Sequence, residues 1–92
     1  METISGWLEY SVQNVGSKSE GYYAILKCEN DVEYILYRSG KFPMGDEFFS
    51  HYNGQRVMVT GKAEVHTGYF CVHTIIEEGK EIEQPKTFND NE

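Results

Sequence analysis

Hydrophobic and polar residues alternate along five short segments of the chain, and a period of two predicts β-strands. The first segment, residues 4–12, places Ile4, Leu8 and Tyr10 on one side and mostly polar residues on the other. The other alternating segments cover residues 21–28, 31–38, 56–64 and 69–76. A tight turn at residues 29–31 joins the second and third strands into a hairpin.

One segment, residues 46–52, changes from a period of two to a helical period. Phe48 and Tyr52 are spaced four residues apart, and Phe49 and Tyr52 three residues apart, which places these aromatic side chains on one side of a helix. Acidic residues at its start favour a helix N-terminus, and Asn53-Gly54 is a typical stop. We therefore expect a helix of about two turns between the third and fourth strands.

The order of these elements, three strands, a short helix and two strands, resembles the OB-fold, a five-stranded Greek-key barrel. Gly6 interrupts the long first strand and predicts a bulge or a sharp bend, where a small barrel must curl. The segment 49–61, an aromatic, a glycine turn and a Val-x-Val-x-Gly strand, is similar to small bacterial OB domains related to tRNA-anticodon-binding modules. The resemblance covers residues 3–77 and implies an all-β barrel, whose floor the helix would plug.

Charge divides the chain into two parts. The 92 residues carry a net charge of −7, and residues 77–92 hold six acidic against two basic residues and no hydrophobic period. We expect a barrel domain at 1–78 and a flexible acidic tail at 79–92, either a solvated terminus or an interaction peptide anchored by Phe88. The acidic balance argues against a protein that grips duplex DNA by charge alone.

The chain has the features of a soluble cytoplasmic protein. Its longest uninterrupted apolar run, residues 22–26, is too short to span a membrane, and residues 1–4 show no secretory signal. We expect no membrane partner. Cys28 and Cys71 form no CxxC pair and are expected to be reduced core residues.

Alternation also assigns side chains to the two faces of the barrel. The residues expected inside carry no charge, and they are Ile4, Leu8, Tyr10, Val12, Tyr22, Ala24, Leu26, Cys28, Val32, Tyr34, Leu36, Val57, Val59, Phe70, Val72 and Ile76. The outer face is unusually apolar and aromatic for a surface exposed to water. Its candidate ligand-binding residues are Trp7, Tyr23, Ile25, Lys27, Ile35, Tyr37, Arg56, Met58 and Lys62.

The resemblance implies a non-catalytic module that binds single-stranded nucleic acid, because OB domains bind ligands on the second and third strands and the flanking loops. Aromatic residues of the face would stack on bases, and basic ones would contact phosphates. The expected platforms are Trp7, Tyr23 and Tyr37, and the expected phosphate contacts are Lys27, Arg56 and Lys62. Loops at 14–20 and 65–68 would form the rims and add Lys18 and His66.

A protein partner fits the same face equally well. Glu9, Glu33 and Glu64 belong to the outer set and offset its three basic residues, which removes the counterion release that drives much nucleic-acid binding. An aromatic face without net charge also suits homodimerisation or an inhibitor that mimics nucleic-acid charge. Both ligand classes therefore remain open.

No combination of residues predicts an enzyme, a metal or a cofactor. Asp46-Glu47 are better explained as helix-start residues than as catalytic carboxylates, and Ser50 and His51 would not face each other on a helix. The two cysteines, His66 and His73 lack the paired spacing of zinc sites. We therefore expect a binding function only.

Overall fold

The computed structural model describes residues 1–64, 66–78 and the backbone of 86–87. Its elements are β1 (Glu2–Gln13), β2 (Gly21–Lys27), η1 (Glu29–Asp31), β3 (Glu33–Arg38), η2 (Glu47–Tyr52), β4 (Arg56–Ala63), β5 (Tyr69–Glu77) and β6 (Lys86–Thr87). All five strands expected from the alternation are confirmed, with shifts of a few residues at their ends. The expected helix is also present, as a 3₁₀ helix.

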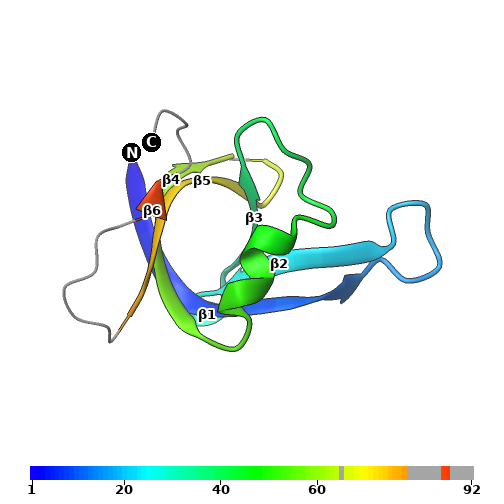
Figure 1. Ribbon diagram of the computed structural model, residues 1–92, viewed down its shortest axis with the longest axis horizontal. Helices are drawn as coiled ribbons and strands as arrows, with labels where there is room; N and C mark the ends of the chain where they lie inside the picture. The colour runs from blue at the N-terminus through cyan, green and yellow to red at the C-terminus, as the bar shows by residue number, and fades with distance from the viewer. Residues whose placement is uncertain (65, 79–85, 88–92) are drawn as a thin grey trace.

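The first five strands close into a barrel (Figure 1). β1 pairs with β2 on one side and β4 on the other, β2 pairs with β3, and β4 pairs with β5, all antiparallel. A parallel pairing of β3 with β5 joins the two ends of the sheet. The order around the barrel is therefore β1-β2-β3-β5-β4.

β1 curves strongly because it belongs to both halves of the barrel (Figure 1). It pairs with β4 through residues 2–7 and with β2 through residues 7–13, so the change of partner comes directly after Gly6. A Cβ atom at Gly6 would lie 2.3 Å from the carbonyl oxygen of Lys27. The bend expected at Gly6 is thus accounted for by a close backbone approach that only glycine permits.

The bulge of the sheet lies in the pairing of β4 with β5. Thr60 pairs with Thr74 and Gly61 pairs with Val72, so His73 is an extra residue in β5. A Cβ atom at Gly61 would lie 1.9 Å from the carbonyl oxygen of Cys71. This second glycine lets the two backbones approach at the irregularity.

The core fills the barrel and is closed by η2. Phe49 and Tyr52 of η2 are buried, as the helical spacing predicted, and pack with the apolar residues of the strands. The N-terminus of η2 is capped by Asp46, whose Oδ1 accepts a hydrogen bond from the Phe48 amide at 3.1 Å. The fully buried large residues of the strands are Leu8, Leu26, Leu36, Val57, Val59, Phe70, Val72 and Ile75.

Four assignments to the inner face are wrong, for three physical reasons. Val12 and Tyr22 are exposed because the β1–β2 hairpin extends beyond the barrel (Figure 1). Val32 is exposed because it lies in the turn before β3 begins. Ile75 is fully buried and Ile76 only partly, because the extra residue at the bulge reverses the alternation along the rest of β5.

A short strand lies within the segment for which the sequence predicts a flexible acidic tail. Lys86 and Thr87 pair with Ile75 and Thr74 of β5, so those two residues extend the sheet. The remaining residues of that prediction, 79–85 and 88–92, Phe88 included, lie outside the described residues. Across the described part of the chain, no helix has the length and apolar character needed to cross a membrane.

Candidate functional site

Three residues of the predicted face form a row across the outside of three strands. Trp7 of β1 lies directly opposite Lys27 of β2 and, on its other side, Arg56 of β4. The side chain of Trp7, the single tryptophan of the chain, is 53% exposed. The sheet thus presents an aromatic ring between two basic residues.

Both of those basic residues are already ion-paired. The Lys27 Nζ lies 2.6 Å from a Glu9 carboxylate oxygen, and the Arg56 Nε lies 3.0 Å from Glu78 Oε1. The hydrogen bond from Lys27 lowers the pKa of the Glu9 carboxyl below its usual value. The row around Trp7 is therefore aromatic but carries little net charge.

Tyr23 does not present its ring for stacking, as the sequence led us to expect. Its side chain is 5% exposed, and its hydroxyl donates a hydrogen bond of 2.7 Å to the carbonyl oxygen of Ser19 in the loop after β1. Ile25, two residues further along β2, is likewise buried. Both residues lie on the outer side, and the hydrogen bond to Ser19 brings the β1–β2 loop against Tyr23.

A pocket of about 250 Å³ opens over the outer side of β2 and β3. Ile25 and Ile35, which lie opposite each other in the sheet, are among its lining residues. The remaining lining residues are Gln13 and Asn14, Glu33 and Tyr34, and Thr67 and Gly68. The Ile35 amide donates to the Gly68 carbonyl at 2.9 Å, which fixes the β4–β5 loop against β3.

A second pocket, of about 330 Å³, adjoins the first and shares Thr67 with it. The rings of Tyr37 and Tyr69 meet there at 69°, with centroids 6.1 Å apart. The other lining residues are Lys41, Pro43 and Glu64. Two tyrosines, a carboxylate and a lysine therefore lie around one open hollow.

Glu64 is held in place by two hydroxyl groups. Tyr37 donates a hydrogen bond to Glu64 Oε2, and the Thr67 hydroxyl donates one of 3.1 Å to Glu64 Oε1. The Thr67 oxygen in turn accepts from the Tyr69 amide at 3.2 Å. The bond to Glu64 is the main reason that the pKa of the Tyr37 phenol is raised, with burial second.

The remaining residues predicted for the face lie on β4 and on the loops. Lys62 of β4 lies in register with Cys71 of β5, which lies in register with Tyr37 of β3, so all three share the outer side. Lys62 is exposed, and within the described residues it has no ion-pair partner. Met58 is half-buried on β4, and Lys18 and His66 are exposed on their loops.

Sequence reasoning missed the composition of the second pocket. Tyr69 and Glu64 flank one short turn and both fall on the outer alternation, so their spacing carried a usable signal. Alternation alone presents Glu64 only as a charge that offsets the basic residues of the outer face. Lys41 and Pro43 come from the β3–η2 loop, whose path no alternation could have given.

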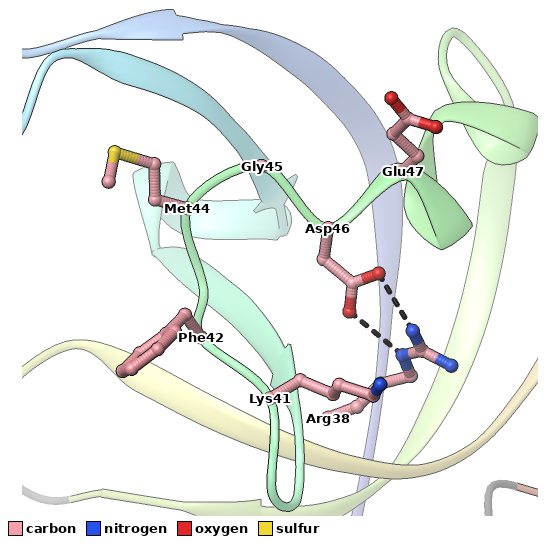
Figure 2. Close-up of a pocket in the computed structure, with 7 residues that line it drawn as sticks. All are labelled: Arg38, Lys41, Phe42, Met44, Gly45, Asp46 and Glu47. Atoms are coloured by element: carbon pink, nitrogen blue, oxygen red, sulfur yellow. Dashed lines mark hydrogen bonds and ion pairs between the residues drawn. The ribbon is translucent and has the colours of Figure 1, made fainter.

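The β3–η2 loop also forms a third pocket, of about 340 Å³, whose centre is a structural ion pair (Figure 2). Arg38 donates from Nε and Nη2 to the two carboxylate oxygens of Asp46, each at 2.8 Å, and its guanidinium lies 4.8 Å over the Phe48 ring. Phe42 and Met44 of the same loop are exposed, at 84% and 43%. Arg38 and Asp46 satisfy each other's charges, so we interpret the pocket as the junction that anchors η2.

Neither a search for metal-binding side chains nor comparison with known proteins adds a further site. Within the described residues, no three or more His, Cys, Asp and Glu side chains gather closely enough to hold a metal ion. Cys28 and Cys71 are free thiols, and burial raises the pKa of Cys28. Comparisons with protein families, with curated proteins and with solved structures found no match to this chain.

Proposed function

We propose that the barrel is an OB-fold and that the chain is a non-catalytic module that binds single-stranded nucleic acid on its outer face. The strand order β1-β2-β3-β5-β4, the parallel β3–β5 pairing and the helix between β3 and β4 support the OB-fold assignment. The fold alone does not give a ligand, because OB domains have many binding roles. The argument for the ligand comes from the surface.

The observation that carries the proposal is the pair of adjoining pockets over β2, β3 and β5. The first is lined by two isoleucines and the second by two tyrosines, and the β4–β5 loop borders both through Thr67. This is the surface on which OB domains bind oligonucleotides. This strip of apolar and aromatic side chains, with polar ones between them, suits unpaired bases, since every base has a π-face.

Trp7 extends this strip onto β1. Glu9 lies opposite Ile25, and Trp7 is the next outward residue of β1, so the tryptophan is adjacent to the first pocket in the sheet. One base stacked on Trp7 and another on the tyrosine pair would contribute about 1–3 kcal/mol each. Lys41 and Lys62 would contact phosphates near the second pocket, since Lys27 and Arg56 are engaged with carboxylates.

Fluorescence anisotropy of a labelled twelve-nucleotide single strand at low salt tests the proposal. We expect saturable binding, and Tyr69→Ala should weaken it about 5- to 150-fold, the equivalent of one lost stacking contact. Tyr22→Ala is the matched control, because Tyr22 is 50% exposed but lines neither pocket. Absence of binding, or an equal loss in both variants, would contradict the proposal.

A protein interface is the second candidate, and the ion pairs beside Trp7 favour it. With Lys27 and Arg56 neutralised, Trp7 resembles the apolar anchor of a protein interface more than part of a basic groove. The partner would be another protein or a second copy of this chain. Light scattering across a hundredfold range of protein concentration tests the second copy, because a dimer through this face should dissociate in Trp7→Ala.

A further inference from the structure

The Glu64 carboxylate in the second pocket has acceptor capacity that its own neighbours do not fill. An ionised carboxylate offers about four lone-pair positions on two oxygens. Tyr37 uses one position on Oε2, and Thr67 uses one on Oε1. One position on each oxygen is left for a ligand, and the two bonds already made fix the orientation of the carboxylate.

The surrounding groups limit what that ligand can be. The ring pair of Tyr37 and Tyr69 offers aromatic surface for a planar group, and Pro43 adds an apolar wall. Lys41 lines the same pocket, so the site joins a positive charge to a carboxylate acceptor. A ligand that fits must therefore be planar, present two adjacent hydrogen-bond donors and carry a negative group nearby.

We propose, resting on the function proposed above, that this pocket selects guanine in single-stranded nucleic acid, with Glu64 accepting hydrogen bonds from N1–H and the N2 amino group. Unpaired bases are commonly recognised by stacking and by hydrogen bonds to their Watson–Crick edge. Lys41 contacts a neighbouring phosphate. Glu64 thereby reads the base, whereas the aromatic strip supplies the affinity that all bases share.

Guanine is the standard base whose Watson–Crick edge presents two adjacent donors. Adenine and cytosine each place a ring-nitrogen acceptor next to their single amino group, and a carboxylate oxygen would repel that acceptor. Uracil and thymine place one N–H between two carbonyl oxygens, which is worse for the same reason. A fixed carboxylate beside a stacking surface therefore discriminates against the other bases, because each of them turns an acceptor atom toward the carboxylate oxygens or leaves one oxygen without a hydrogen bond.

An arginine side chain of a partner protein also presents two parallel donors to a carboxylate. Lys41 argues against that ligand, because this residue lines the same pocket and its positive charge would repel a second cation. The same positive charge attracts a phosphate. The composition of the pocket thus favours a nucleotide, and an arginine ligand becomes an outcome that the experiment can detect.

Two labelled hexanucleotides that differ in one atom group provide the test. A thymidine strand with one central guanosine is compared with the same strand carrying inosine, which lacks only the N2 amino group. We expect the wild-type chain to bind the guanosine strand at least about tenfold more tightly, the loss typical of one hydrogen bond to a charged acceptor. Glu64→Gln should bring this ratio close to one, while Glu29→Gln, an exposed glutamate in the β2–β3 turn, should leave it unchanged.

The outcomes separate this inference from the function on which it rests. If both strands bind equally well to the wild-type chain, or if Glu64→Gln keeps the ratio, the guanine inference is overturned while single-strand binding stands. If neither strand binds, both proposals are overturned. If an arginine-containing peptide binds in a Glu64-dependent manner and the oligonucleotides do not, the pocket is a guanidinium site of a protein interface.

Discussion

The hydroxyl of Tyr37 donates a hydrogen bond to the carboxylate of Glu64, two residues separated by 27 positions in the chain. The bond joins β3 to the loop after β4, on the side of the barrel where β3 and β5 close the sheet. It therefore has a structural and a functional role. It holds the loop after β4 against β3, and it orients the carboxylate of Glu64 in the tyrosine-lined pocket.

Tyr37→Phe should lower stability in a pH-dependent manner. Since the folded-state pKa of Tyr37 is raised, the bond's contribution is complete below the unfolded tyrosine value of about 10 and is lost as the pH rises through the folded value. In urea denaturation at pH 8 we expect a loss of about 0.5–1.5 kcal/mol, the net worth of one hydrogen bond, and a smaller difference above pH 10. Tyr34→Phe is the control, and a difference between wild type and Tyr37→Phe that grows with pH would refute the prediction.

Gly61→Ala should destabilise the barrel by about 2–4 kcal/mol, because the added Cβ would lie 1.9 Å from a backbone carbonyl that cannot move freely. Gly21→Ala is the matched control. Its Cβ would meet only the flexible end of the Met44 side chain, so a loss below about 1 kcal/mol is expected. Thermal or urea denaturation of both variants provides the measurement, and equal losses would show that the close approach at the bulge is not required.

Asp46→Ala should cost about 2–4 kcal/mol, since it removes a largely buried ion pair with Arg38 and the cap of η2 together. The Asp46 side chain is 7% exposed, so water cannot replace either interaction. Glu47→Ala, one residue later and exposed, should change stability by no more than about 0.5 kcal/mol. Should the two variants unfold at the same urea concentration, the junction drawn in Figure 2 does not anchor the helix.

Oligonucleotide binding should depend only weakly on salt. Each phosphate contact contributes about −0.7 to the slope of log affinity against log salt for single strands, so contacts from Lys41 and Lys62 predict a slope of about −1.4. Lys62→Ala should reduce it to about −0.7. A slope steeper than about −3 would mean that Lys27 and Arg56 leave their carboxylates to contact phosphates.

The strand pattern was predictable because each strand has one apolar side, and alternation reports that directly. The side of the sheet on which an individual side chain lies was harder to predict. Ile75 and Ile76 exchange places because of one extra residue in β5, and no local pattern marks His73 as that residue. Tyr22 follows the inner alternation correctly but is exposed because the β1–β2 hairpin projects beyond the barrel, which is a property of the whole fold.

The candidate site was predictable only in outline. The outer aromatic character was visible, but the burial of Tyr23 involves a hydrogen bond to the β1–β2 loop. Whether Lys27 and Arg56 are ion-paired depends on which glutamates lie close to them in the folded barrel, and these are Glu9 and Glu78. Alternation identifies Glu64 only as a negative charge on the outer face. Its role as an oriented hydrogen-bond acceptor depends on Tyr37, which comes from another strand.

An NMR titration of the full chain with a short single-stranded oligonucleotide tests the central claim most directly. We expect the backbone amide signals of Ile25, Ile35 and Tyr69 and the indole signal of Trp7 to shift together and saturate. Amides of Ser50 and His51, which are exposed on η2 and line neither pocket, should not move. Shifts confined to that second group, or no shift with excess oligonucleotide, would contradict binding on the outer face of the barrel.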